Sequence, residues 1–500
     1  MAHVRRALFG ARPSRMSSTR SRGVVAAGHE LTAATAADIL RQGGTAFDAA
    51  IAALAMSCVC EPILSSPGGG GFAMVRDGAT GSTHLIDFFP QTPLERRMGA
   101  DHDGVLQIHA DFGTATQAFH IGPATVATPG FFHGLLALHA RGATHSLIDL
   151  FGPAVRAART GISISPFQHY LTTVVEPIVT NTAGTRSLFA PNGTLLQPGE
   201  TFRNPGLADA LESLALSGVG GQVDLAIVEN QAQRGHVVAG DLEAYEAIER
   251  TPLAVDINGA TVHLNPLPAA SGTLIAHTLS HLESADAVDI ARALLATSQA
   301  RQSAGGDLSA LASVPLRQRG TTHISVIDAN RTACSVTISN GSGNGEVVDD
   351  FGFMLNNILG EEDVNPGGSG GWPTNTRLSS MMCPTMIEFS DGRVVALGSG
   401  GSNRIRSAIC QVVISLCMSG VDLSAAVKAP RLHVEAGHLD FEDLYNESVR
   451  DELVALFADH RAWPERNMFY GGVHSVGMDS ADGFAGCGDA RRDGTAIVVE

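Results

Sequence analysis

The stretch LRQRGTTHISVIDANRTACSV, residues 316–336, contains the pattern that decides the fold. An arginine-containing segment ends at Gly320 and Thr321 and continues directly into an alternation of apolar and polar residues. This alternation predicts a β-strand that begins near Thr321. A threonine at the entry of a strand is most simply a structural residue. The alternative is that Thr321 becomes the first residue of a new chain after self-cleavage.

The second interpretation has a chemical reason. A threonine hydroxyl is a weak nucleophile unless a base takes its proton. If the chain is cut before Thr321, the new α-amine has a pKa of about 7.7–8.0 and supplies that base within the same residue. The residues of the stretch alone favour a plain strand entry, so the rest of the sequence has to separate the two interpretations.

A glycine-rich loop in the second half is a further candidate site. The loop Gly398-Ser399-Gly400-Gly401-Ser402 follows the apolar strand pattern RVVAL and precedes the helix pattern IRSAICQVVISL. Backbone N–H groups at such a junction can converge on an anion. Because the loop lacks the lysine of a phosphate-binding loop, an oxyanion hole is the better functional interpretation, beside that of a plain tight turn.

Other motifs indicate structure rather than chemistry. Residues 367–371 match G-x-S-x-G, but Trp372-Pro373 follows where a helix should begin, so we predict a loop. The glycines of residues 68–71 open into a strand and not a helix, which favours close backbone packing over a dinucleotide site. His323 is expected to be a hydrogen-bonded core residue. The 19 histidines form no H-E-x-x-H pattern, and no metal or other cofactor is expected.

The bulk composition excludes several classes of protein. With 500 residues, 44% hydrophobic and 17% charged, the chain is globular. A net charge of -17 argues against a nucleic-acid partner. Seven cysteines without a C-x-x-C pair predict buried free thiols. Residues 1–23 form a basic tail whose apolar block is too short for a secretory signal, so a cytoplasmic location is expected. No apolar run is long enough to span a membrane.

Strand and helix patterns alternate in both halves of the chain, which favours a layered α/β fold. Apolar residues at helical spacing between residues 33 and 40 predict one helix, which Gly43-Gly44 ends. Thr45 is a plausible N-cap for a second, alanine-rich helix, with Asp48 at the capping-box position. Since this helix is apolar nearly all round, we expect it to be buried.

Several segments match the blocks of a known family in their order along the chain. They are AAGHELTAATAADILRQGGTAFDAAIAALAMSCVCEPILSSPGGGGFAMV, TVATPGFFHGLLALHARG, GTTHISVID, FGFMLNNILGEEDVNP, RLSSMMCPTMI, GSGGSNRIRSAI and GCGDARRDGTA. From about Val24 to the C-terminus, the chain thus resembles the γ-glutamyltransferase (glutathione hydrolase) family of N-terminal nucleophile hydrolases. The resemblance implies a four-layer αββα sandwich. It also implies self-cleavage between Gly320 and Thr321, with residues 24–320 and 321–500 staying together as a heterodimer of one domain.

The resemblance also implies roles for individual residues. Thr321 would attack the amide carbonyl of a γ-glutamyl amide such as glutathione and pass the acyl group to water, an amino acid or a peptide. The backbone N–H groups of Gly401 and Ser402 match the oxyanion hole of the family. Ser339 stands where the family has a threonine whose hydroxyl contacts the amine of the nucleophile. Ser379 and Ser380 match the serine pair that holds the carboxylate of the substrate.

The chain departs from the family at the positions that bind the glutamate α-amino acid group. Phe89 stands in place of an arginine, and an apolar ring cannot replace an arginine–carboxylate pair. Ile358 replaces a polar residue that binds the amine. The nearby acid is Glu361, and Asn340 lies at or near the position of a family asparagine. The residues that the resemblance assigns to acyl transfer are therefore matched, whereas those assigned to binding the α-amino acid group are altered.

These departures leave three functions open. The first is a γ-glutamyl hydrolase and transferase, and the second is an acylase for another amide, of the glutaryl or cephalosporin type. The third function belongs to a different class of protein: a non-enzymatic binding relative that is never processed. In the first two cases the partners are a small acyl-amide substrate and the chain's own second fragment.

Overall fold

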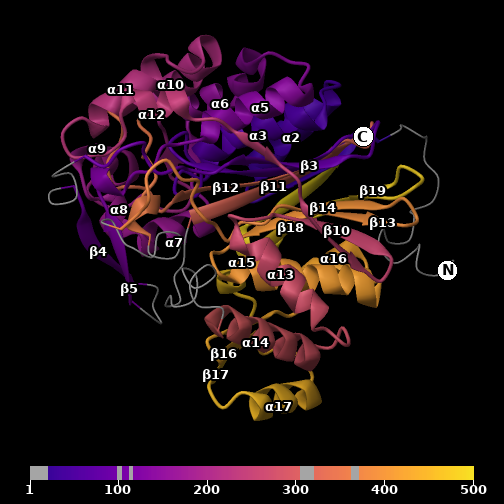
Figure 1. Ribbon diagram of the computed structural model, residues 1–500. Helices are drawn as coiled ribbons and strands as arrows, with labels where there is room; N and C mark the ends of the chain where they lie inside the picture. Colours follow the sequence, from indigo (N-terminus) through magenta and orange to yellow (C-terminus); the bar gives the residue numbers. More distant parts are fainter. Residues whose placement is uncertain (1–20, 98–103, 112–115, 304–319, 362–370) are drawn as a thin grey trace.

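A computed structural model of the chain describes residues 21–97, 104–111, 116–303, 320–361 and 371–500. Two sheets pack face to face in the middle of the molecule, and helices cover the outer face of each (Figure 1). The predicted four-layer αββα sandwich is confirmed.

The first sheet contains the strand that the opening stretch predicts. In the described chain its strands are, in spatial order, β20 (Thr495–Val499), β1 (Gly23–Ala27), β11 (Gly320–Asp328), β12 (Ala333–Gly341), β2 (Gly70–Arg76), β3 (Thr83–Phe88) and β8 (Ile248–Arg250). All neighbours are antiparallel. β11 and β12 therefore lie in the centre of the sheet, flanked by strands from the first quarter of the chain.

The second sheet carries the glycine-rich loop at the end of one of its strands. Its order is β19 (Phe484–Cys487), β18 (Gly472–Met478), β14 (Val394–Gly400), β13 (Thr385–Phe389), β10 (Ala260–Leu264) and β9 (Leu253–Ile257). The predicted strand–loop–helix unit is confirmed, since β14 ends at Gly400 and α15 (Arg404–Ile414) begins four residues later. A single π-helical turn, Ser415–Ser419, extends α15.

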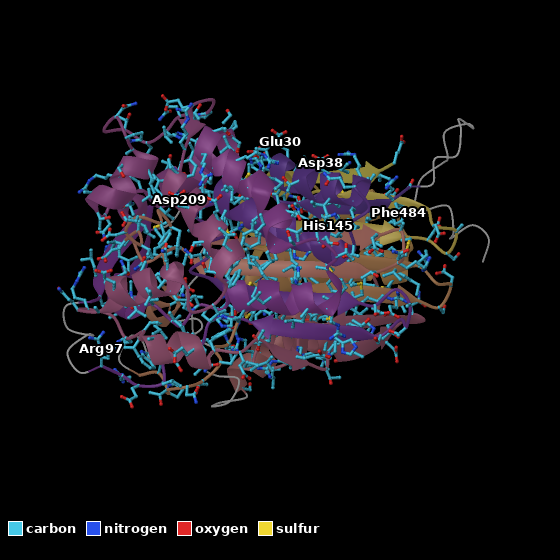
Figure 2. The ribbon with its side chains drawn as sticks, turned by 90° about the horizontal axis from the view of Figure 1, so that it is seen from above. Glu30, Asp38, Arg97, His145, Asp209 and Phe484 are labelled. Atoms are coloured by element: carbon cyan, nitrogen blue, oxygen red, sulfur yellow. The ribbon has the colours of Figure 1, made fainter. Side chains whose placement is uncertain are left out.

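Helices form the two outer layers. Over the first sheet lie α2 (Glu30–Arg41), α3 (Ala46–Cys60), α5 (Phe131–Gly142), α6 (Leu147–Thr160), α10 (Pro205–Ser217), α11 (Gln222–Gln231) and α12 (Ala239–Ala244). Beside the second sheet lie α13 (Ala270–Ser280), α15, α16 (Leu423–Lys428) and, farther out, α14 (Ala287–Ser303) and α17 (Glu447–Leu456) (Figure 1). From above, Glu30 and Asp38 of α2 and Asp209 of α10 lie on the upper helical layer (Figure 2).

Smaller elements complete the fold, and the sequence patterns did not predict most of them. They are the short helices α7 (Pro166–Val174), α8 (Glu176–Val179) and α9 (Ala183–Phe189), the sheet of β15 (Leu432–Glu435), β16 (His438–Glu442) and β17 (His460–Trp463), and the pairs β4 (Leu106–Asp111) with β5 (Thr116–Ile121) and β6 (Ile162–Ser163) with β7 (Thr201–Phe202).

The two N-terminal helices form as predicted. Asp48 closes a capping box with Thr45 at the start of α3, and each residue of α3 is buried. The alanines allow α3 to pack closely on its neighbours and on β11. All seven cysteines are free and buried, as expected.

The side chains of β11 alternate between two cores, as the pleat of a strand requires. Ile324 and Val326 pack with α2 and α3, whereas Ile327 packs with the second sheet. His323 also faces the second sheet, because a Cβ atom built on Gly398 would lie 2.4 Å from its ring. Its ring nitrogens hydrogen-bond Thr337 and Ser325, both at 2.8 Å, and burial keeps its pKa well below the ordinary value. The prediction of a core histidine is confirmed.

The glycine tract of residues 68–71 packs against neighbouring backbone, as predicted. A Cβ atom on Gly69 would lie 2.4 Å from the carbonyl oxygen of Ser339, and one on Gly71 would lie 2.2 Å from that of Thr337. Most of the predicted 367–371 loop lies outside the described residues. In the part of the chain that the structure describes, no helix is long and apolar enough to cross a membrane. The same residues contain no cluster of three His, Cys, Asp or Glu that could hold a metal.

Candidate active site

Thr321 lies one residue inside β11, at the end of the strand nearest the glycine-rich loop. It is buried, and the strand pairing shifts register between Gly320 and Thr321. A Cβ atom on Gly400 would lie 2.2 Å from the Thr321 carbonyl oxygen. Because a side chain has no room there, the end of β14 can approach the backbone of Thr321 closely. The structure thus brings together two candidate sites, Thr321 and the glycine-rich loop with Gly401, which are 80 residues apart in the sequence.

Ser339 holds the carbonyl group that precedes Thr321. Its hydroxyl donates a hydrogen bond of 2.6 Å to the carbonyl oxygen of Gly320 and accepts one of 3.0 Å from the N–H of Gly341. Ser339 lies directly opposite Thr321 across β11 and β12. A hydroxyl in this position withdraws electron density from the Gly320 carbonyl and makes its carbon more electrophilic.

The loop after β14 has an unusual backbone. Gly401 has a φ of 131° and Ser402 a φ of 56°, and the latter is uncommon for a residue with a side chain. The Ser402 hydroxyl is buried and has no hydrogen-bond partner among the described residues. Strained backbone of this kind often occurs at functional sites, where it aims N–H groups at a ligand.

Asn340 and Glu361 lie beside the same strand ends. Asn340 is fully buried, and its amide donates to the carbonyl of Met354 at 3.3 Å. A Cβ atom on Gly341 would lie 2.7 Å from a carboxylate oxygen of Glu361. The carboxylate of Glu361 thus lies beside Gly341, the residue that pairs with Gly320. Glu362 and Asp363, its acidic neighbours, lie outside the described residues.

Ser379 and Ser380 lie in the segment that precedes β13, and Ser380 forms a bridge with Ala269 at the start of α13. The hydroxyl of Ser379 donates to the carbonyl of Pro268 at 2.8 Å, and the hydroxyl of Ser380 accepts from the N–H of Met382 at 3.1 Å. A carboxylate bound here would have to take over the hydroxyl proton that Ser379 now gives to Pro268. Their expected role as carboxylate ligands stays a prediction.

Phe89 and Ile358 contribute to one apolar cluster between the layers. The ring of Phe89 stacks on Phe72 with 5.5 Å between centroids. Arg377 lies beside Phe89 and donates to the carbonyl oxygen of Phe89 at 2.8 Å and to Asp87 at 3.3 Å. Because Arg377 is committed to these backbone and carboxylate oxygens, it does not substitute for the arginine that Phe89 replaces.

Two charged residues near Thr321 were not among the predicted site residues. Glu61, directly after α3, accepts a hydrogen bond of 2.9 Å from the hydroxyl of Thr322. Arg492 lies beside the glycine-rich loop, since one of its guanidinium nitrogens would be 3.4 Å from a Cβ atom on Gly401. An acid directly after a helix that is apolar nearly all round was the available signal for Glu61.

Comparison with known proteins agrees with this geometry. Residues 32–297 and 278–499 match the family model of gamma-glutamyltranspeptidase. The glutathione hydrolase proenzyme of Bacillus subtilis (strain 168) is 27% identical over 546 residues, which cover 95% of this chain and 91% of that protein. The acylase ACY 1 proenzyme of Pseudomonas sp. (strain V22) is 28% identical over 539 residues, covering 96% and 94%.

Solved structures show the same fold. The cephalosporin acylase from Bacillus halodurans superposes with a TM-score of 0.82 and 22% identity, covering 98% of both chains. The αββα sandwich with a threonine at the start of a central strand is that of the N-terminal nucleophile hydrolases. Within this class, the chain belongs to the gamma-glutamyltranspeptidase family of hydrolases and acylases.

Proposed function

We propose that the chain cleaves itself between Gly320 and Thr321 and then acts as an amide hydrolase and acyltransferase with Thr321 as its nucleophile. The observation that supports this best is the hydrogen bond from Ser339 to the carbonyl of Gly320, directly before Thr321. The names of both curated relatives, which call them proenzymes, support processing as well. The first candidate substrate is a γ-glutamyl amide such as glutathione.

In the cleavage step, the hydroxyl oxygen of Thr321 attacks the carbonyl carbon of Gly320. The C–N bond breaks as the nitrogen takes up the hydroxyl proton, and an ester joins Gly320 to the threonine side chain. Water then hydrolyses the ester, which leaves a carboxylate on Gly320 and a free amine on Thr321. Ser339 stabilises the negative charge that develops on the Gly320 oxygen.

In turnover, the α-amine of Thr321 takes the hydroxyl proton while the oxygen attacks the amide carbonyl of the substrate. The N–H groups of Gly401 and Ser402 receive the developing oxyanion. The leaving amine departs with the proton, and water or an acceptor amine then takes the acyl group from Thr321. No cofactor enters either step.

A denaturing gel tests this proposal. Wild-type protein should show two bands, and the smaller fragment should begin with the sequence TTHIS. Thr321→Ala should stay one band near 52 kDa and lose amidase activity by about three orders of magnitude or more. Thr173→Ala, at an exposed helical position, is the matched control and should behave as wild type. A wild-type chain that never splits would point to the non-enzymatic binding relative.

A second candidate substrate is favoured by Phe89. Its ring and the side chain of Ile358 belong to one apolar cluster, at the positions where the resemblance places family residues that bind an α-amino acid group. An acyl group without the α-amine and α-carboxylate, such as glutaryl or a cephalosporin side chain, suits such a cluster better, because no buried charge is left unpaired. The acylase names among the relatives support this candidate.

A further inference from the structure

The buried carboxyl group of Glu61 lies directly beside the strand that contains the proposed cleavage site. One oxygen accepts the 2.9 Å hydrogen bond from the hydroxyl of Thr322, and the other has no hydrogen-bond partner among the described residues. A Cβ atom on Gly28 would lie 2.7 Å from Glu61, 2.8 Å from the Thr322 hydroxyl and 3.4 Å from the His474 ring. These three groups therefore surround Gly28 tightly, and the contact between Glu61 and Thr322 is closely constrained.

The segment that begins with Glu61 touches the chain on both sides of the Gly320–Thr321 peptide bond. A Cβ atom on Gly320 would lie 2.5 Å from the carbonyl oxygen of Ile63 and 2.4 Å from that of Gly341. On the other side, Glu61 holds the side chain of Thr322. The register shift of the sheet falls between these two contacts. Residues 61–63 thus fix the irregular backbone that presents the Gly320 carbonyl.

Glu61 cannot itself touch the reacting hydroxyl. Successive side chains of a strand point to opposite faces. Ile324 and Val326 place the even-numbered residues of β11 on the side of α3, and His323 places the odd-numbered ones toward the second sheet. Thr322 therefore faces Glu61, whereas Thr321 faces the layer of Gly400. Any effect of Glu61 on the chemistry has to pass through the position of Thr322.

The surroundings of Glu61 make its charge sensitive to pH near neutrality. Burial raises its pKa to about 7, although the hydrogen bond from Thr322 and the charge of Arg492 lower it. A cavity of about 30 Å³ borders the carboxyl group, with apolar walls that include Phe167, Leu171 and Phe202. The titratable or charged groups that face Glu61 from the elements around it are Cys58, Cys60, His29, His474, Arg492 and Asp493.

We propose that Glu61 is a positioning residue for self-cleavage, because its carboxylate anchors Thr322 and so holds the Gly320–Thr321 bond in the reactive register. The ionised carboxylate accepts the Thr322 hydrogen bond more strongly than the neutral acid does. The anchor is therefore strongest above neutral pH. This inference rests on the self-cleavage proposed above.

The test follows the cleavage of newly made chains over time. Wild type, Glu61→Gln and Thr322→Val are made by cell-free synthesis with a labelled amino acid, and the intact and cut bands are measured on denaturing gels between pH 6 and pH 9. Glu61→Gln keeps the shape of the side chain but not its charge. We expect it to slow cleavage about tenfold and to remove a rate increase centred near pH 7.

Thr322→Val removes only the hydroxyl and should slow cleavage to a similar degree. The double variant should be no slower than either single variant, because both break one contact. Glu30→Gln, an exposed acid in α2, is the matched control and should follow the wild-type rate and pH profile. A purely structural loss would lower thermal stability without changing the shape of the pH profile.

The outcomes distinguish this inference from the proposed function. If wild type splits and both Glu61→Gln and Thr322→Val split at its rate with its pH profile, the positioning role is wrong while self-cleavage stands. If Glu61→Gln fails to fold, the cleavage rate and pH profile of Thr322→Val alone test the positioning role. A wild-type rate and pH profile for Thr322→Val would then show that this role is wrong. If wild type never splits, self-cleavage is wrong and the role of Glu61 is wrong with it.

Discussion

At the scale of single residues, the choice between the two proposed substrates depends on Phe89. An arginine there would offer a planar fork to a carboxylate, with hydrogen bonds worth about 1.5–3 kcal/mol each. Phe89 instead stacks on Phe72 and contributes only apolar surface. Under the proposed function, a substrate carboxylate therefore gains no hydrogen bond from this side chain, and we expect weaker binding of an α-amino acid group than of an apolar acyl chain.

The expected substrate preference follows from the presence of Phe89 in place of an arginine. Wild type should turn over glutaryl-p-nitroanilide at least as well as γ-glutamyl-p-nitroanilide, measured as kcat/KM. Phe89→Arg should raise kcat/KM for the γ-glutamyl compound by about 10- to 100-fold, the equivalent of about one charged hydrogen bond.

The extent of self-cleavage shows whether the Phe89→Arg variant has folded. A processed variant that gains nothing on the γ-glutamyl compound would contradict this role for position 89. A wild type that strongly prefers the γ-glutamyl compound would exclude the acylase alternative.

At the scale of elements, the start of α3 is fixed by one carboxylate. Asp48 accepts hydrogen bonds from the N–H and hydroxyl of Thr45 and from the N–H and hydroxyl of Thr144, each at 2.8–2.9 Å, and from the N–H of His145 at 3.0 Å. Burial alone would raise its pKa, but these donors outweigh burial and the pKa is lowered. Asp48 thus joins the capping box of α3 to the loop after α5.

Removing this charge should destabilise the fold. In Asp48→Asn the amide N–H₂ meets at least one backbone N–H group, which can only donate, so we expect a loss of about 2–3 kcal/mol and a lower apparent Tm by differential scanning fluorimetry. Asp38→Asn is the control, because Asp38 lies in α2 with its side chain 62% exposed (Figure 2). An unchanged Tm for Asp48→Asn would mean that the five donors find water or other acceptors.

The elements also show which parts of the fold the sequence could predict. The capping box, the glycine-tract strand and the strand–loop–helix order around residues 394–414 depend on residues close together in the chain, and these predictions are confirmed. The strand continues to Gly400, through the first three residues of the predicted loop. The contact between Glu61 and Thr322 joins residues 261 apart, and no local pattern contains it. The same holds for Arg377, whose partners near Phe89 lie almost 290 residues away. Roles that come from resemblance alone, such as those of Ser379 and Ser380, stay predictions.

At the scale of the whole molecule, the two expected fragments are interlocked. β11 and β12 lie between β1 and β2, and β20 pairs with the outer edge of β1. A cut before Thr321 would therefore leave the central strands of residues 321–500 hydrogen-bonded on both sides to residues 24–320. Separation would break the first sheet in its middle, which explains why the fragments should stay together after cleavage.

The C-terminal segment contributes to both sheets, and a buried ion cluster fixes it between them. Asp489 contacts Arg431 at 2.6 Å and Arg491 at 3.3 Å, and it accepts from the N–H of Val473 in β18. Burial alone would raise the pKa of Asp489, but the two arginines and backbone N–H groups outweigh it and the pKa is lowered. The cluster links β18 to the residues that lead into β20.

The pH dependence of stability follows from the direction of this shift. A carboxylate whose pKa is lower in the folded than in the unfolded state stabilises the fold above its unfolded pKa of about 3.9, and this stabilisation is lost as pH falls through the folded pKa. The apparent Tm of wild type should therefore decrease between pH 5 and pH 3. Asp489→Asn leaves two buried guanidinium groups underpaired, so it should lose about 3–5 kcal/mol at pH 7 and change less between pH 5 and pH 3.

Asp459→Asn is the matched control for this prediction, because the Asp459 side chain is 79% exposed and lies outside the cluster. It should keep the wild-type Tm and the wild-type response to acid. If Asp489→Asn responded to acid as strongly as wild type, the acid sensitivity would belong to other carboxylates. If the variant also kept the Tm of wild type at pH 7, the backbone acceptors of Arg431 and the contacts of Arg491 with Glu442 and backbone carbonyls would be sufficient to hold the two arginines. The C-terminal segment would then depend on the pairing of β20 with β1 rather than on the ion cluster.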